Sequence, residues 1–402
     1  MALVSGVEKR VVVSKETTWG VLPATNTGKE LRRVTSEFNL ERANFQSAEI
    51  TSTAQTSDSR NGTDSIAGTL NGELSPGSYS DIFASLLRGT WAAAVTSGAQ
   101  ITIAGASGKF VRSAGSWLTD GFKAGDMVAV SGFTTTGLAN NDNWLVVAVT
   151  ATDLSVVNAH DLSKTVAVKA EGDSVTVAGV GKKLAIPLTL AGRTNESYTV
   201  EEYLAPQDEA YLTTGVKFGS AAVQIQPNSM TTVNFSAMGR TQELKATAGE
   251  YFTAPTAAST AGIFSGNKGI IVVDGVAQAI VTGINFEITG NMETSLVVGN
   301  RQAADISLGR ITATGEATLY YENGSIYNKF KNDEDISLFV FMEADAGEYM
   351  VIKFPRIRLG GANRDDKEVG NLIQTVPFTA LLPKGTDPAV EQSTVVIIDS
   401  LA

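Results

Sequence analysis

The sequence predicts a mainly β protein with two β-sandwich or β-barrel domains, each carrying a flanking helix, and a small β-barrel inserted into the first domain. The region from Val281 to Leu381 consists of short runs in which apolar and polar residues alternate, separated by Gly, Asn and Asp. That pattern is typical of an antiparallel sheet with one buried face. Segments of this region match earlier segments in the same order, and a Gly- and Asn-rich stretch, Thr96 to Val180, interrupts the earlier copy.

Four matches indicate an internal duplication. The strongest sets Thr375–Leu381 (TVPFTAL) against Thr232–Met238 (TVNFSAM), with identical Thr, Val, Phe and Ala. Strands draw on few residue types, so one match means little, whereas four in the same order favour duplication. The other three set Gly315–Phe330 against Gly68–Phe83, Val281–Ile288 against Val34–Glu41, and Glu348–Phe354 against Ser197–Tyr203.

Composition excludes several classes of protein. The chain has 402 residues, a net charge of −11, one histidine and no cysteine, so disulfides and thiolate sites are excluded. The acidic balance, without a basic patch, argues against a tight nucleic-acid binder. No apolar run is long enough to cross a membrane, and the first residues, MALVSGVEKR, lack a signal-peptide core. We therefore expect a protein made in the cytosol, without a membrane partner.

The N-terminal third mixes arms with sheet. Residues 1–33 combine a short β-prone run with Pro and Gly breaks, and this arm either folds back on its own domain or lies on a neighbouring copy, which we favour. Trp19 is interpreted as a local packing residue or, alternatively, as an aromatic that fills a pocket of the neighbour. The first domain comprises residues 34–95 and 181–240. In it, the polar stretch Ser47–Gly68 predicts a long loop or projecting hairpin between subunits. Helical spacing of apolar residues predicts a helix within Ser75–Gly89, with Ser78 or Ser80 as N-cap and Gly89 as its stop.

The remaining segments follow from turn chemistry. Residues 96–180 predict a compact barrel that projects outward, because insertions succeed at exposed loops. Residues 241–274, rich in Thr, Ala, Gly and Ser, read as a linker, and residues 275–382 form the second domain. The C-terminal arm, 383–402, ends in an apolar strand, Ser393–Ala402, without an obvious partner in its own domain.

No catalytic, cofactor-binding or metal-ligating residues are predicted. His160 beside Asp161 lacks the partners of a catalytic base, and Gly105–Phe110 departs from the phosphate-loop spacing, so a hairpin turn is the better interpretation. The carboxylate clusters Asn332–Asp335 and Arg364–Glu368 lack the spacing of a calcium loop. They are interpreted as turns, with a structural ion as the alternative.

The order of polar loop, NGELSPGSY turn (Asn71–Tyr79), helix and closing TVPFTAL-like strand resembles the tail tube, or major tail, proteins of long non-contractile-tailed bacteriophages. The stretch Asp120–Phe133 (DGFKAGDMVAVSGF) is similar to small barrels inserted in phage structural proteins. The resemblance implies β-sandwich domains with one flanking helix, six of which close a ring around a DNA channel. Rings stack into a tube that meets tape-measure, tail-terminator and tail-tip proteins.

Two domains per chain would make the ring a trimer with pseudo-six-fold symmetry, and a hexamer of single-domain chains is the alternative. A net negative lumen would let DNA pass without binding. A β-rich tail-tip protein or receptor-binding adhesin is the main alternative function, and an enzyme such as a carbohydrate lyase lacks its acid–base pair. We expect deletion of residues 47–65 or 393–402 to abolish assembly of a folded chain, and deletion of residues 96–180 to spare the tube.

Overall fold

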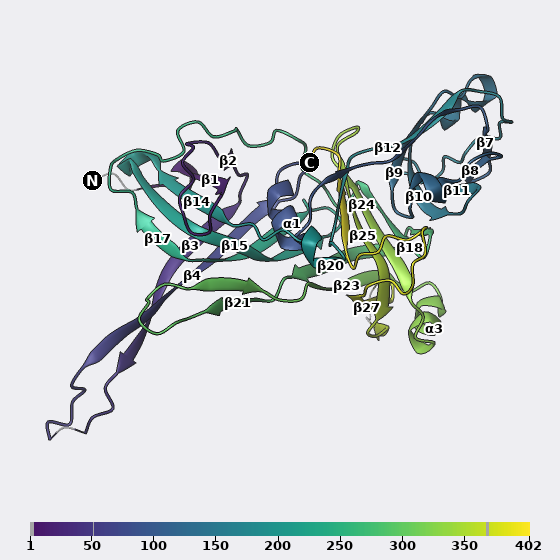
Figure 1. Cartoon of the computed structure of the whole chain (residues 1–402). Coiled ribbons are helices and arrows are strands. Elements are labelled where there is room, and N and C mark those ends of the chain that lie inside the picture. Colours follow the sequence, from purple (N-terminus) through teal and green to yellow (C-terminus); the bar gives the residue numbers. More distant parts are fainter. Residues whose placement is uncertain (1–3, 51, 367–369) are drawn as a thin grey trace.

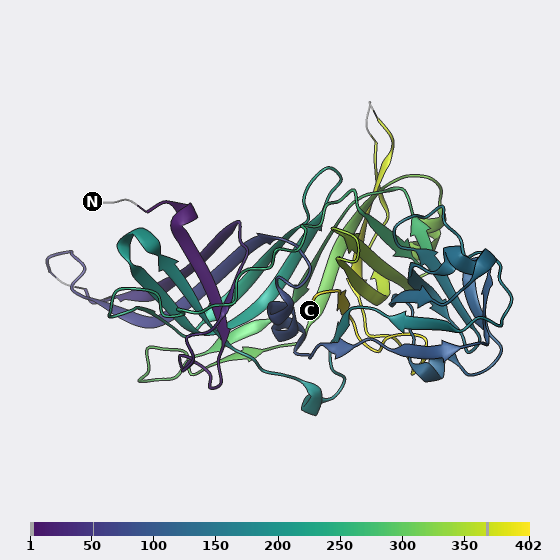
Figure 2. The same cartoon turned by 90° about the horizontal axis from the view of Figure 1, so that it is seen from above.

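The computed structural model describes residues 4–50, 52–366 and 370–402. The fold is mainly β, as predicted, with 47% of residues in strands and 9% in helices. Figures 1 and 2 show an elongated molecule with the N-terminus and a projecting hairpin towards one end and a separate sheet at the other. In the described part of the chain, no helix is long and apolar enough to span a membrane.

Two sets of elements with the same strand pairings make up most of the molecule. The first set, called repeat 1, contains β1 (Lys9–Lys15), β3 (Thr35–Gln46), β4 (Ser59–Glu73), α1 (Ser80–Leu87), β14 (Tyr198–Leu204), β15 (Glu209–Ile225), β16 (Thr232–Gly239) and β17 (Thr241–Leu244). The second set, called repeat 2, contains β18 (Gly269–Val273), β20 (Val281–Thr289), β23 (Thr312–Tyr320), α3 (Ser325–Lys331), β24 (Ile336–Glu343), β25 (Tyr349–Leu359), β27 (Ile373–Ala380) and β28 (Val396–Asp399).

The pairings recur strand for strand. The antiparallel chain β1–β14–β15–β16–β4–β3 in repeat 1 has the counterpart β18–β24–β25–β27–β23–β20 in repeat 2. In each repeat a further strand joins the long strand, β17 beside β15 and β28 beside β25. Because each long strand belongs to two layers, each repeat is a two-layered unit around one core.

The sequence matches agree only in part with these pairings. The closing strands TVNFSAM and TVPFTAL lie on β16 and β27, which are counterparts. The match of Val34–Glu41 with Val281–Ile288 is out of register, because it sets exposed Asn39 against buried Phe286. An odd shift of this kind exchanges the two faces of a strand. The match of Glu348–Phe354 with Ser197–Tyr203 is wrong, because β25 is the counterpart of β15 and not of β14.

Strands β15 and β20 pair with each other, and so one sheet runs through both repeats. We call this the shared sheet, and its strand order is β3–β4–β16–β15–β20–β23–β27–β25. One of its faces packs on the core, which includes Phe38, Phe235, Phe286 and Phe378. The other face is described below.

Helix α1 covers this core in repeat 1. Its residues Ile82, Phe83, Leu86 and Leu87 are buried, as the helical spacing predicted. Its N-cap is Tyr79, not Ser78 or Ser80, because these serines bond elsewhere. Its C-cap is Arg88, with φ 53°, so the left-handed residue that ends the helix comes one position before the predicted Gly89.

Residues 96–179 form a separate seven-stranded antiparallel sheet with its own core around Trp117 and Trp144. Its order is β6-β12-β9-β10-β11-β8-β7. Within the described residues no pairing joins β6 to β7, so the ladder of the predicted small barrel is open at that point. The elements are β6 (Thr96–Gln100), β7 (Ile103–Ala106), β8 (Lys109–Arg112), α2 (Trp117–Asp120), β9 (Met127–Ser131), β10 (Asn143–Val149), β11 (Asp153–Asn158) and β12 (Val175–Gly179).

This inserted sheet interrupts repeat 1 but packs on repeat 2. Met127 and Leu145 of the inserted sheet share an apolar cluster with Phe339, Phe341 and Val351 of β24 and β25. Alternation along those two strands sends neighbouring residues, such as Val340 and Ile352, into the main core instead. The inserted sheet therefore buries the outer face of repeat 2 and is not a free appendage.

The chain ends also differ from expectation. Strand β1 pairs with β14 and β2 (Lys29–Glu30) of its own chain, and the Trp19 indole N–H donates to the Gly215 carbonyl (3.2 Å), so this arm lies on its own repeat. Strand β28 lies between β25 and β13 (Lys182–Ala185), so the C-terminal strand has partners in its own chain. The predicted linker carries β17 and β18 and buries Phe252 and Phe264. The remaining short strands are β5 (Ala92–Ala93), β19 (Val276–Gln278), β21 (Met292–Ser295), β22 (Asp305–Leu308) and β26 (Asn363–Asp365).

Candidate functional site

The face of the shared sheet that points away from the core is polar across its whole width. Directly opposed residues of an antiparallel ladder point to the same face, so the register alone identifies this surface. One row crosses all strands in the order Arg358, Thr379, Thr314, Glu287, Ala222, Asn234, Asn71, Thr35. We call this surface the polar face.

The rows on either side give the polar face its charge. One contains Glu316 and Glu73, in the order Pro377, Glu316, Asn285, Gln224, Thr232, Glu73. The other ends in Glu37, in the order Thr312, Thr289, Ser220, Ser236, Thr69, Glu37. With Glu287, these three rows carry four glutamates among amide and hydroxyl side chains, and their one basic residue, Arg358, lies at the β25 edge.

A hollow of about 930 Å³ opens on the polar face. Its lining comes from both repeats and includes Asn71, Gln224, Asn285, Glu287 and Thr314. A sheet that curls around an open hollow lined by polar side chains is suited to enclosing a passage, because wide barrels leave a water-filled lumen where small ones are filled by side chains. The alternation of Glu, Asn and Thr along each strand is the signal from which this face could have been located in the sequence.

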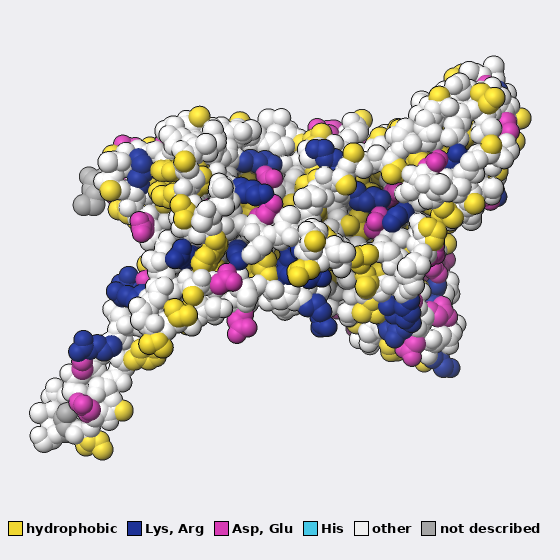
Figure 3. Space-filling view, in the orientation of Figure 1, with side chains coloured by type: hydrophobic (Ala, Val, Ile, Leu, Met, Phe, Trp, Pro, Cys, Tyr) yellow, Lys and Arg dark blue, Asp and Glu magenta, His cyan; other side chains and the backbone are white. Residues whose placement is uncertain are grey.

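The β3–β4 hairpin stands clear of the molecule (Figures 1 and 3). Its first strand ends at Gln46 and its second begins at Ser59, so residues 59–64 belong to the second strand. Phe45 is 63% exposed and Ile50 is fully exposed, which are unusual positions for large apolar side chains. This hairpin is therefore a candidate contact surface.

The residues considered for chemistry serve structural contacts. The His160 Nδ1 lies 2.8 Å from the Glu343 carboxylate, which links the inserted sheet to β24. Gly105–Phe110 is the β7–β8 hairpin, with Gly108 at φ +72° in its turn. No group of three or more potential metal ligands occurs in the described residues. Asp335 of the Asn332–Asp335 cluster forms ion pairs with Arg356, Arg358 and Lys384. The cluster Arg364–Glu368 extends beyond the described residues.

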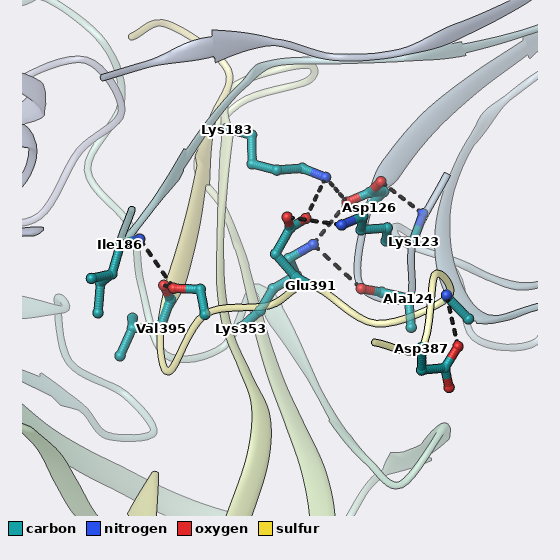
Figure 4. A network of polar contacts seen from close by, with 11 residues as sticks. Lys123, Ala124, Asp126, Lys183, Ile186, Lys353, Asp387, Glu391 and Val395 are labelled. Atoms are coloured by element: carbon teal, nitrogen blue, oxygen red, sulfur yellow. Dashed lines mark hydrogen bonds and ion pairs between the residues drawn. The ribbon is translucent and has the colours of Figure 1, made fainter. Parts of the chain in front are cut away.

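A buried ion cluster joins the inserted sheet to repeat 2 (Figure 4). The fully buried Lys353 Nζ lies 2.7 Å from Asp126 Oδ1, and Lys183 Nζ lies 2.8 Å from the same oxygen. Glu391, in the segment before β28, contacts Lys183 at 2.9 Å and Lys123 at 3.1 Å. Three lysines and two carboxylates from four parts of the chain are thus held together.

The pKa values of the two central groups, Asp126 and Lys353, are both lowered, but for different reasons. Burial raises the pKa of Asp126, but the charges of Lys353 and Lys183 outweigh it and hold that pKa below its usual value. Burial lowers the pKa of Lys353, and the Asp126 charge offsets this only in part. Because both charges are out of water, each depends on its partner.

Comparison with known proteins identifies the family. No curated protein matches the chain. A family model described as phage tail tube protein matches residues 6–380. The match spans repeat 1, the inserted sheet, the shared sheet and all of repeat 2 except β28. The chain therefore belongs to the phage tail tube protein family.

Proposed function

We propose that this protein polymerises as stacked rings into a phage tail tube and that its polar face lines the channel through which genome DNA is delivered into the host. Family membership already gives a structural role in the virion tail and implies self-assembly into a tube. The observation that carries the finer proposal is the single polar face running through both repeats, with a hollow of about 930 Å³ before it. The proposed tube is of the long, non-contractile type.

We divide the chain accordingly. Residues 34–95 with 181–240, and residues 275–382, are proposed as two tube domains, and residues 96–180 as an inserted domain on the outside of the ring. The recurring pairings support two such domains, and they add β1 and β17 to the first and β18 and β28 to the second. The β15–β20 pairing supports treating the two domains as adjacent ring positions. Three chains then supply six domains, so the proposed ring is a trimer with pseudo-six-fold symmetry.

The channel surface is proposed to be acidic. Glu37, Glu73, Glu287 and Glu316 would repel the phosphate backbone, and their neighbours are uncharged amides and hydroxyls. DNA then passes without binding sites that retain it. The structural role of the family supports a non-enzymatic function. The proposed partners are further copies, DNA in transit, and the tape-measure, tail-terminator and tail-tip proteins. Assembly is placed in the host cytoplasm.

Ring mass tests the proposal. Native mass spectrometry of disassembled tubes, with electron microscopy of the assembled protein, should give rings of three chains that show six similar lobes around an open centre. Rings of six chains would overturn the proposal of two tube domains per chain, but they would agree with the proposal that the protein forms a tube. A protein that stays monomeric at all concentrations, or forms isolated fibres, would overturn the tube itself.

A further inference from the structure

Two edges of the shared sheet lack a strand partner in the described part of the chain. On β3, the Ser36 and Phe38 carbonyls accept side-chain hydrogen bonds from Lys9 and Gln242, which leaves the edge open from Leu40 onward. On β25, pairing with β24 ends at Ile357. Open edges of this kind pair readily with other strands.

The molecule contains a model for what closes them. In the joint inside the chain, β15 of repeat 1 pairs antiparallel with β20 of repeat 2 over Ser220–Ile225. The open strand β25 is the counterpart of β15, and the open strand β3 is the counterpart of β20. The joint inside the chain therefore predicts that β25 of one copy pairs antiparallel with β3 of a second copy.

Residue identities suggest the register. Ala221 lies opposite Phe235 and Leu359 lies opposite Phe378, the shared Phe of the two closing strands. Phe38 and Phe286 each lie opposite a glycine, Gly68 and Gly315 respectively. A Cβ on Gly68 would come within 2.3 Å of the Phe38 ring, and one on Gly315 within 2.5 Å of the Phe378 ring and 2.8 Å of the Phe286 Cβ, so at both positions only glycine leaves room for an aromatic side chain.

By these equivalences Leu359 corresponds to Ala221, and Leu40 corresponds to Ile288. Because Ala221 lies opposite Ile288 in the joint inside the chain, Leu359 should lie opposite Leu40. Backbone direction agrees with this register. The Gly360 N–H donates to Pro377 of β27 (2.7 Å), so the N–H and C=O of Leu359 point to the open side. The Phe38 carbonyl also points to its open side, and so therefore does that of Leu40. Core-facing residues then lie opposite core-facing residues.

In this register Arg358 lies opposite Glu41. The β25 edge is basic, because Arg356, Arg358 and Lys384 share one carboxylate, Asp335, at 3.0, 3.0 and 3.3 Å. The Nε of Arg358 is buried without an acceptor in the described residues. The β3 edge is acidic and exposed at Glu37 and Glu41. The equivalent pair in the joint inside the chain, Ser220 with Thr289, is neutral.

The joint inside the chain also includes a hairpin. The β21–β22 hairpin of repeat 2 lies across repeat 1: the Asp64 N–H donates to the Arg301 carbonyl (2.8 Å) and Lys217 Nζ to the Ile306 carbonyl (2.7 Å). The β3–β4 hairpin is its counterpart in repeat 1. In a second copy it would lie across repeat 2 of the first.

A groove lies at that place, and its lining comes from repeat 2 and from the neighbouring part of repeat 1. The groove has a volume of about 780 Å³, and its lining includes Ile311, Leu381 and Leu382. Three arginines line it without any carboxylate, and the Nε of Arg88 is buried without an acceptor in the described residues. The arginines are Arg88, Arg193 and Arg310. The hairpin offers exposed Phe45 and Ile50 with more carboxylates than cations, so its apolar and charged groups complement the groove.

We propose that the interface between two copies repeats the joint inside the chain: the β25 edge of one copy pairs with the β3 edge of the next, with Arg358 facing Glu41, and the β3–β4 hairpin fills the arginine-lined groove. This inference rests on the proposed function, since it names the surface by which rings close. The pair inside the chain is neutral, whereas the pair between chains is charged, and this distinguishes the two joints. The charged pair favours contact between the basic β25 edge and the acidic β3 edge over contact between edges of like charge.

Cross-linking tests the register, because the chain has no cysteine of its own. In the full-length double variant Asn39→Cys/Gly360→Cys, mild oxidation of assembled protein should give a denaturation-resistant ladder that ends at the number of chains in a ring. Opposed residues of this kind have Cα atoms about 4.5 Å apart, within the range of a disulfide. Ser36→Cys/Gly360→Cys, which places the two sulfurs on opposite faces, is the control and should stay monomeric under denaturation.

Charge exchange tests the recognition. Glu41→Arg and Arg358→Glu should each weaken association of monomers about fivefold per joint, and the double exchange should restore it. Glu322→Arg and Lys331→Glu, both exposed and away from the edges, should leave association unchanged. Thermal melts of the monomers should coincide for all these variants, which separates lost recognition from lost folding.

The hairpin is tested by Phe45→Ala, which should weaken association several-fold, with exposed Val276→Ala as the matched control. Rings that form but do not cross-link through Asn39→Cys/Gly360→Cys, or that cross-link better when Cys replaces Glu37 or Glu41, would overturn this interface and leave the tube intact. No change with Phe45→Ala would overturn the hairpin contact. Absence of any association in the unchanged protein would instead contradict the proposed function.

Discussion

Lys353 and Asp126 form a buried ion pair, 2.7 Å between Nζ and Oδ1, across the contact between repeat 2 and the inserted sheet. The two residues are far apart in the sequence, because the second half of repeat 1 and most of repeat 2 lie between them. The pair therefore ties an insertion in one repeat to the core of the other.

Removing one partner of this pair should be costly. Asp126→Ala leaves the Lys353 ammonium buried with no adequate counter-charge, and we expect a loss of about 3–5 kcal/mol in the free energy of unfolding. Asp153→Asn breaks the more exposed pair with Lys109 and should cost about 1 kcal/mol or less. Chemical denaturation of the two variants measures the difference, and equal losses would contradict the role of the buried pair.

Acid should weaken the β25 edge. A hydrogen bond from Arg356, with further contacts to Lys384 and Arg358, lowers the pKa of Asp335 from 3.8 to about 2. Because the folded-state pKa is below the unfolded one, the stabilisation is present above pH 3.8 and is lost as the pH falls through about 2. The difference in stability between the unchanged protein and Asp335→Asn should therefore shrink from pH 5 to pH 2. A constant difference over that range would show that Asp335 contributes nothing through its charge.

Truncation after Gln392 should prevent folding, contrary to the expectation of a folded chain that fails to assemble. It removes Val396, Ile397 and Ile398, which are at most 2% exposed. Each buried side chain of this size contributes about 1.5–3 kcal/mol, and a domain has about 5–15 kcal/mol in all. Soluble yield and protease resistance measure the effect, with removal of Ala402 alone as the control.

Deletion of residues 96–180 should also fail, because it exposes Phe339, Phe341 and Val351 and removes Asp126 from Lys353. We expect aggregation of the simple deletion. The same deletion combined with Phe339→Thr, Phe341→Thr and Lys353→Met should recover soluble, assembling protein. Normal assembly of the simple deletion would mean that the inserted sheet adds no stability to repeat 2.

The polar face should acquire DNA affinity when its charge is reversed. Glu287→Lys with Glu316→Lys should still assemble, since both side chains point away from the core, but the tubes should retain DNA in a salt-dependent way. Exposed Glu209→Lys with Glu322→Lys makes the same change in net charge elsewhere and should retain less. Co-sedimentation of DNA at two salt concentrations checks this, and equal retention would place the lumen elsewhere.

Local pattern was sufficient for the strands, the position of helix α1 and the equivalence of β16 with β27. The period-two alternation of Asn285, Phe286, Glu287 and Ile288 already separates the core face from the polar face. Local pattern could not predict which segments that are distant in the sequence pair with one another. Nothing in Val396–Asp399 indicates that β25 and β13 enclose it, and the charge cluster around Lys353 joins segments whose proximity depends on the whole fold.

Strand β15 runs without a break from the outer layer, beside β14 and β17, into the shared sheet, beside β16 and β20. A single strand thus spans the thickness of the wall, and sliding one layer over the other would require breaking hydrogen bonds on both sides of it. A conduit built from such units would flex at the seams between successive discs, while the bore of each disc kept its diameter.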